Sequence, residues 1–205
     1  MPLPSPISPY QRALGADFDL LAPQLRERLS PPSDRAVGHS AGIVTAGSRS
    51  RVLRPLLSAL AARRIAFPGF GTATPVSVTT VPGPGEGLSR GREFLFPGAA
   101  APADSRLIED TVHAIDGALH VFLGRSRALE TAFSPTVTDG GLTLVSTGTW
   151  LHAGRFRLRI PAPIAPRVVV SERWVDDALR VESHVTAPFF GQVFEYAGSL
   201  DHTWR

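Results

Sequence analysis

The sequence predicts an α+β, mostly β domain: an antiparallel meander curled into a barrel or half-barrel, with two N-terminal amphipathic helices covering one end or face. Three turn-forming dipeptides, Asp116-Gly117, Asp139-Gly140 and Asp176-Asp177, each separate two short stretches rich in alternating apolar residues, which is typical of β-hairpins. Helical periodicity ends before Gly71, and short alternating strands follow it. Closure into a barrel is expected because it removes the open edges of a long meander.

The N-terminal third of the chain carries the helical segments. Four prolines in residues 1–9 predict a disordered tail before a single small-molecule-binding domain over residues 10–205. Amphipathic helices are expected over residues 10–29 and 51–64, because apolar residues in both recur at spacings of three and four. A short strand is expected between them, at residues 36–47.

Strands make up the remainder of the predicted fold. They are expected at residues 74–81 and 90–96, on both sides of each of the three turns, and at residues 189–200. This gives about seven to nine strands in meander order.

Composition excludes several classes of protein. Cysteine is absent, which excludes disulfides, thiolate catalysis and cysteine-based zinc sites. No apolar run is long enough to span a bilayer, and residues 1–10 lack the regions of a signal peptide, so we expect a cytoplasmic protein. All 21 basic residues are arginines and the formal net charge is only +3. Because the arginines are spread along the chain and mostly interleaved with acids, we expect no nucleic-acid partner.

The segment VVVSERWV, residues 168–175, places charges inside an apolar strand. Strand alternation puts Glu172 and Trp174 on one face. A two-residue turn at Asp176-Asp177 then sets Glu172 opposite Val181, on a face that is mainly apolar. The other face collects arginine, glutamate and histidine, so Glu172 is the charge that we expect to point inward.

The inner face predicted in this way is too polar for a plain core and is typical of a ligand cavity. Its polar and aromatic members on the last strands are Glu172, Trp174, Ser183, Gln192, Phe194 and Tyr196. A buried carboxylate has a raised pKa unless it is paired, and a general acid or base needs such a pKa. Two alternatives remain open: Glu172 serves chemistry, or it pairs with an inward arginine such as Arg92 or Arg157 and only stabilises the barrel.

A second constellation flanks Asp116-Gly117. A two-residue turn there sets His113 opposite His120, with Glu109 on the same side. Two histidines and a carboxylate can bind a metal, but no HExxH or similar spacing supports such a site, and we predict none. These histidines face solvent if the helices leave this sheet uncovered, and they line the cavity if the helices cover its outside. No motif of a phosphate loop, dinucleotide site or serine hydrolase occurs, so no cofactor is expected.

Five motifs occur in order along the chain: SPYQRALGADFDLLAPQLRERL, RGREFLF, LIED, IPAPIAPRVVVSE and APFFGQVFEYAGSL. Together they resemble the bacterial "domain of unknown function 4166" family. The positions that match the signature of that family are Arg92, Phe94, Glu109, Pro161, Pro166, Glu172, Gly191, Tyr196 and Gly198. The chain departs from the family at Arg90, where the family tends to have tryptophan, and at Asp110-Thr111. Family members are found alone or fused to dehydrogenase-like domains, and the resemblance therefore implies work on small organic molecules.

Our hypothesis is a cofactor-free enzyme of specialised metabolism that cyclises, isomerises or otherwise rearranges an apolar, oxygenated substrate in the barrel. Glu172 would act as general acid/base, Tyr196 as donor to a developing oxyanion, and Arg92 as anion clamp. The substrate-binding residues would be Trp174, Phe194, Gln192, Ser183, Trp150 and Glu109. Two alternatives remain: a non-catalytic carrier of a lipid or polyketide-like ligand, and an accessory domain of a dehydrogenase. The oligomeric state, a homo-oligomer included, is left open.

Overall fold

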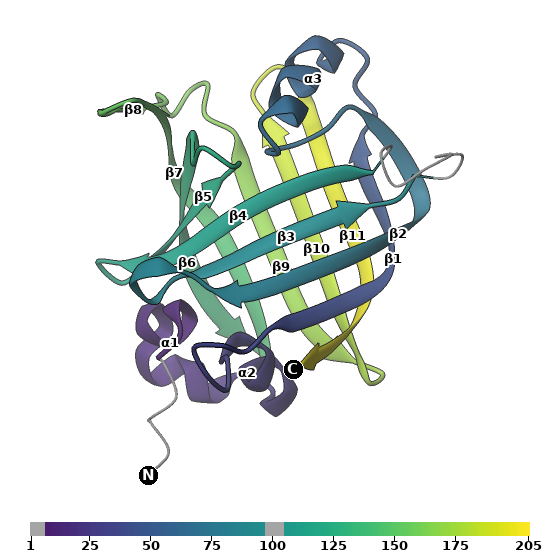
Figure 1. Cartoon of the computed structure of the whole chain (residues 1–205). Coiled ribbons are helices and arrows are strands. Elements are labelled where there is room, and N and C mark those ends of the chain that lie inside the picture. The colour runs from purple at the N-terminus through teal and green to yellow at the C-terminus, as the bar shows by residue number, and fades with distance from the viewer. Residues whose placement is uncertain (1–6, 97–104) are drawn as a thin grey trace.

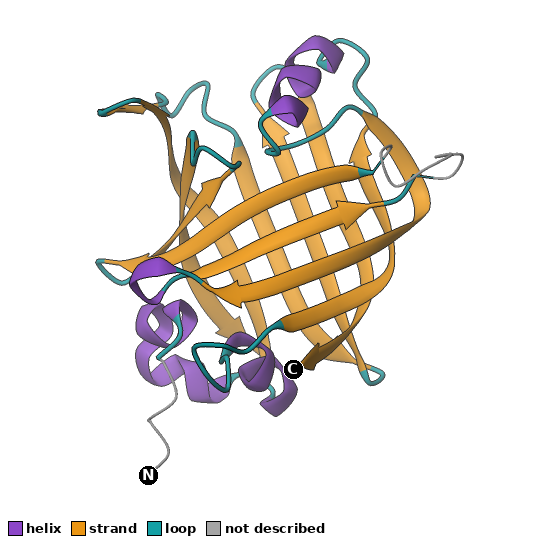
Figure 2. Ribbon diagram, in the orientation of Figure 1, coloured by secondary structure: helices purple, strands orange, loops and turns teal. Residues whose placement is uncertain are grey.

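The computed structural model describes residues 7–96 and 105–205 and shows a closed antiparallel β-barrel of ten strands (Figures 1 and 2). The first strands along the chain are β1 (Gly38–Ser48), β2 (Gly69–Pro82), β3 (Leu88–Phe94), β4 (Arg106–Ile115), β5 (Ala118–Leu123) and β6 (Leu129–Thr138). The others are β7 (Gly141–Ala153), β8 (Phe156–Arg159), β9 (Arg167–Val175), β10 (Ala178–Ala187) and β11 (Gly191–Trp204). The predicted fold class is confirmed.

The strands follow one another as a meander. Each pairs with its neighbour in the chain, except that β7 pairs with β9 and the short β8 pairs with β7 alone. Pairing of β1 with β11 closes the ring. All three predicted turns are present, and both residues of each have positive φ, for example 50° at Asp116 and 75° at Gly117. Such angles are those of a type I′ turn, whose twist matches that of the flanking strands.

Two glycines allow β1 and β11 to approach where the ring closes. A Cβ atom on Gly42 would lie 2.1 Å from the carbonyl oxygen of Ser199, and one on Gly198 would lie 2.4 Å from the carbonyl oxygen of Ile43. Neither distance is compatible with a side chain. These positions therefore have a steric reason to be glycine, as is common where strands bend sharply or approach closely.

The predicted helix over residues 10–29 is wrong, because the segment forms three short pieces. They are α1 (Pro9–Leu14), the 3₁₀ helix η1 (Gly15–Leu20) and α2 (Pro23–Leu29). Gly15 has a φ of 55°, and Ala22 is extended because it precedes Pro23. Residues 1–6 of the predicted tail lie outside the described residues, but Ser8 is buried and caps α1 through its hydroxyl, which accepts from the Gln11 backbone N–H.

The helices cover both ends of the barrel (Figure 1). The pieces α1, η1 and α2 lie under one end, which we call the plugged end, and bury Tyr10, Leu14, Phe18 and Leu25. The helix α3 (Arg54–Ala62), which falls within the predicted 51–64, lies at the opposite end, which we call the open end. None of the helices in the described ranges is long and apolar enough to cross a membrane.

Candidate functional site

A cavity of about 510 Å³ lies inside the barrel, between α3 and the plugged end. Its wall is mainly apolar, with valine, leucine, isoleucine and phenylalanine side chains from the strands and Leu53, Leu56, Leu57 and Leu60 from α3 and the residue before it. Its charged groups gather toward the plugged end, and its neutral polar residues are Thr131, Ser183 and Tyr196. We call the charged groups together with Tyr196 the floor, which consists of Arg28, Arg90, Arg92, Asp110, Glu172 and Tyr196.

Asp110 is the centre of one half of the floor. It lies on β4 directly opposite Arg90 of β3, and Arg92 is the next inward residue of β3. Nε of Arg90 donates to Oδ1 of Asp110 at 2.9 Å, and Nη1 of Arg92 donates to Oδ2. Burial raises the pKa of Asp110, but the two guanidinium groups outweigh that effect and hold the pKa below its usual value. Asp110 is therefore ionised, and it is not a proton donor at neutral pH.

Glu172 forms the other half of the floor. It points inward from β9, as predicted, and its Oε2 accepts from Nη1 of Arg28 on α2 at 2.5 Å. Both side chains are buried, with 9% of Arg28 and 6% of Glu172 exposed. The alternative that Glu172 pairs with an arginine is therefore the observed one, although the partner is neither Arg92 nor Arg157. The structural role follows directly, because the pair joins the helical plug to the barrel wall.

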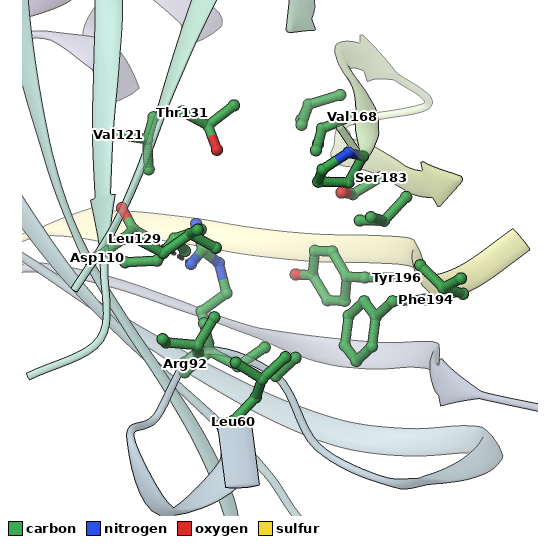
Figure 3. A pocket seen from close by; sticks show the side chains of 18 of the residues that line it. Leu60, Arg92, Asp110, Val121, Leu129, Thr131, Val168, Ser183, Phe194 and Tyr196 are labelled. Carbon is green, nitrogen blue, oxygen red and sulfur yellow. Dashed lines mark hydrogen bonds and ion pairs between the residues drawn. The ribbon is translucent and has the colours of Figure 1, made fainter. Parts of the chain in front are cut away.

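Tyr196 supplies the neutral polar group of the floor. It faces inward from β11, packs edge-on against Phe94 with ring centroids 5.6 Å apart, and is 6% exposed. Figure 3 shows Tyr196 and Arg92 pointing into the same space. Within the described part of the chain, the Tyr196 hydroxyl is buried and has no hydrogen-bond partner. Burial raises the pKa of Tyr196, so the phenol keeps its proton at neutral pH and can donate it in a hydrogen bond.

The sequence profile of the family described as Domain of unknown function (DUF4166) matches residues 21–200. The chain belongs to the DUF4166 family. That match includes the floor residues on α2, β3, β4, β9 and β11. No curated protein matches the chain.

Of the six predicted substrate-binding residues, two line the cavity of this DUF4166 barrel and four do not. Phe194 and Ser183 line it. Trp174 packs against the core and does not line the cavity. Gln192 is exposed, and its side chain donates to Glu195 at 2.7 Å. The register with β10 shifts between the pairs Val185–Phe194 and Thr186–Gln192, which leaves Val193 of β11 as an extra residue, so strand alternation could not place Gln192.

Glu109 and Trp150 lie on the outer wall of the DUF4166 barrel. Glu109 forms an ion pair with Arg64, one position before the inward Asp110. Trp150 lies against Arg157, whose guanidinium carbon is 4.3 Å from the centroid of the ring. Neither side chain lines the cavity, so their predicted place in the substrate site is wrong.

The two histidines of the first hairpin also lie outside the barrel. His113 and His120 are paired as predicted, and neither lines the cavity. His120 and His152 each contact one oxygen of Glu130 at 2.6 Å, and Arg157 donates to both oxygens at 2.7 and 2.8 Å. We call these four residues the Glu130 cluster. Burial raises the pKa of Glu130, but its four hydrogen bonds lower it to about 2.

The DUF4166 cavity also contains residues that the sequence reasoning missed. Arg28, Arg90 and Asp110 were not predicted as site residues, yet all three line the cavity. Alternation along β3 would have placed Arg90 and Arg92 on the face of Phe94, because these residues are two apart. No comparable pattern indicated Arg28. Among the described residues, no group of three or more His, Asp or Glu side chains is arranged to hold a metal ion.

Proposed function

We propose that this protein binds an apolar small molecule inside the barrel, with an acidic or carbonyl-bearing end of the ligand held at the floor. The cavity volume of about 510 Å³ falls in the range of small-molecule sites, about 300–1,000 Å³, which are also mostly apolar with a few placed polar groups. The apolar wall supports a hydrophobic ligand body. The floor supports a single polar end.

The charge of the floor is the observation that carries this proposal. The charged residues that line the cavity are Arg28, Arg90, Arg92, Asp110 and Glu172. Arg28 and Glu172 balance each other, while Arg90 and Arg92 share the one carboxylate of Asp110. One positive charge is therefore not offset by a lining carboxylate. An uncompensated charge is costly in an apolar interior, and an anionic or strongly accepting ligand group would offset it.

Arg92 and Tyr196 are the floor residues best placed to contact that group. The Arg92 side chain is 19% exposed, compared with 9% for Arg28 and 9% for Arg90. A guanidinium can bind a carboxylate through two parallel hydrogen bonds, and the unpartnered hydroxyl of Tyr196 adds a third donor. This pair gives the site its proposed preference for a carboxylate or a polarised carbonyl.

A cofactor-free cyclisation, isomerisation or related rearrangement is the second candidate. It is favoured by the same hydroxyl of Tyr196, which would donate to an oxyanion that develops on the substrate, beside the positive charge of Arg92. Glu172 contacts Arg28 as a carboxylate, so in this hypothesis it accepts a proton rather than donating one. Glu172→Gln is then expected to keep ligand affinity and abolish turnover, and normal turnover by that variant would contradict the role.

Displacement of a fluorescent apolar dye tests the binding proposal. Dodecanoate and 1-dodecanol have the same chain and differ in the polar end, so we expect dodecanoate to displace the dye at about tenfold lower concentration, corresponding to about 1.4 kcal/mol. Arg92→Leu should remove this preference and leave displacement by dodecanol intact. Arg180→Leu, which changes an exposed outer-wall arginine, is the matched control. No displacement by either compound would contradict binding in the barrel.

Native mass spectrometry detects a retained ligand, and incubation of that ligand with the protein separates the carrier from the enzyme. A ligand retained through purification is expected in both cases. Recovery of that ligand chemically unchanged after incubation with the protein contradicts the rearrangement, whereas conversion to an isomer of equal mass, detected by chromatography, contradicts a carrier role.

A further inference from the structure

The described connections at the open end contain no aspartate or glutamate, and three of them carry arginines. Residues 49–68 carry five arginines, residues 124–128 carry two and residues 154–166 carry three. All three loops lie at one end, because alternate connections of an antiparallel barrel emerge at the same end (Figure 1). The connections between paired strands at the plugged end each contain an acid instead, which is aspartate in three of them and Glu86 between β2 and β3. The arginines are mostly interleaved with acids along the sequence, but the described connections at this end carry arginines without acids.

Seven of these ten arginines are exposed and form no ion pair with a described acidic residue. Arg49, Arg64 and Arg157 reach acids on the barrel wall. The others make no ion pair within the described residues, and all are exposed; they are Arg51, Arg54, Arg63, Arg125, Arg127, Arg155 and Arg159. As far as the described residues show, the open end thus presents seven exposed positive charges without an ion-pair partner.

Large apolar side chains stand exposed among these charges. In the turn between β10 and β11, Phe189 is 94% exposed and Phe190 is 52% exposed. Around them, Val52 is 77%, Leu56 is 56% and Ile164 is 58% exposed. Four of the five, all but Val52, line the mouth of the cavity. A gathering of exposed apolar residues on one face of a protein marks an interaction surface.

The backbone of Phe189 adds an independent observation. Its φ is 68°, in the left-handed region that a bulky side chain rarely adopts. The turn is closed by a hydrogen bond from the Phe190 N–H to the carbonyl oxygen of Ala187 at 3.2 Å. Strain of this kind persists where the surrounding structure imposes it, often at functional sites. Here it holds an aromatic ring away from the protein at the tip of a turn.

We propose that the open end docks on the surface of an anionic lipid bilayer, with Phe189 and Phe190 inserted at the boundary of the acyl chains and the arginines against the headgroups. Surface binding of this type combines buried apolar area with attraction to acidic lipids. A nucleic acid complements the charge but offers no apolar medium to rings that project from a turn, and an acidic protein would need a matching apolar pocket, whereas an anionic bilayer supplies both charge and an apolar interior. The cavity opens at this face, so an apolar ligand could pass between bilayer and barrel; this last point rests on the proposed function.

Sedimentation with vesicles tests the docking. Vesicles of phosphatidylcholine with phosphatidylglycerol are expected to bind the protein, vesicles of phosphatidylcholine alone are not, and added salt should weaken the binding. Phe189→Ser/Phe190→Ser should abolish it. Arg51→Gln/Arg54→Gln should weaken it by about fivefold for each charge removed. The matched control is Arg35→Gln/Arg205→Gln, which removes two exposed arginines elsewhere and should leave binding unchanged.

Three outcomes overturn the docking proposal. They are equal binding to both kinds of vesicle, unchanged binding by the phenylalanine variant, and an equal loss in the control variant. Retention of a DNA duplex without vesicle binding would also overturn it and assign the surface to nucleic acid. Circular dichroism confirms that each variant is folded. Because the vesicles contain no dodecanoate and the dye displacement contains no vesicles, this proposal and the proposed function can fail separately.

Discussion

Nη1 of Arg28 lies 2.5 Å from Oε2 of Glu172, although 144 positions separate the two residues in the chain. Arg28 belongs to α2 of the helical plug, and Glu172 belongs to β9 of the barrel wall. The buried pair therefore connects two parts of the fold that the sequence alone does not connect, and it closes the cavity at the plugged end.

Removal of one partner of this pair should be costly, because the other charge stays buried. Arg28→Met is expected to lower the free energy of unfolding by about 3–5 kcal/mol, and the double variant Arg28→Met/Glu172→Leu should recover most of that loss. Chemical denaturation measures both. Arg12→Met, which breaks the half-exposed pair with Glu86, is the control and should cost less than about 1 kcal/mol. Equal losses in Arg28→Met and Arg12→Met would contradict the proposed attachment of the plug.

Alternation along each strand was sufficient to predict which residues of the barrel wall point inward. It could not predict which residues of other elements they contact. The hairpin at Asp176-Asp177 and strict alternation placed Glu172 inward and opposite Val181, as observed. The same rule failed at Gln192, because a bulge in β11 adds Val193, which alternation does not anticipate. The partner of Glu172 could not be predicted, since Arg28 comes from a helix whose docking position depends on the finished barrel.

The Glu130 cluster should make stability depend on pH in the acid range. The pKa of Glu130 is lowered from 4.5 to about 2 in the folded protein, so its contribution is complete above pH 4.5 and is lost as the pH falls toward 2. The expected loss is about 2–3 kcal/mol. Unfolding free energies measured across this window should fall steeply for the natural sequence and less steeply for Glu130→Gln. Equal slopes would contradict the assignment, and Asp110, whose pKa is also lowered, accounts for a residual slope in both.

The Glu130 cluster also shows why the sequence could not decide whether His113 and His120 face solvent or the cavity. His113 and His120 occupy the register that the turn at Asp116-Gly117 predicts. Their face depends on what covers the sheet, and that is decided by the helices, which lie at the ends of the barrel and leave its sides open. Glu130 and Arg157 come from β6 and β8, so the contacts that organise His120 depend on strand pairing beyond the hairpin.

His202 should produce a separate change of stability at higher pH. Burial, together with the smaller effect of the nearby Arg28, lowers the pKa of His202 from 6.5 to about 4. The folded protein thus favours the neutral imidazole. The contribution of His202 to the free energy of unfolding is therefore fully present above pH 6.5 and is lost as the pH drops from 6.5 to about 4. After allowance for screening by solvent, we expect a loss of about 1–2 kcal/mol. His202→Asn can keep the hydrogen bond with Ser40 and should lose this dependence; a variant with an unchanged pH profile would contradict the assignment.

The Tyr196→Phe variant tests whether the Tyr196 hydroxyl serves ligand binding or the stability of the fold. This hydroxyl is buried and unpartnered among the described residues, and such a group costs free energy unless it is hydrogen-bonded. Phenylalanine should therefore leave the free energy of unfolding unchanged within about 0.5 kcal/mol or raise it. The same variant should reduce the preference for dodecanoate over 1-dodecanol, because one donor to the carboxylate is lost. A loss of stability larger than about 1 kcal/mol with an intact preference would show that the hydroxyl serves the packing of the barrel instead.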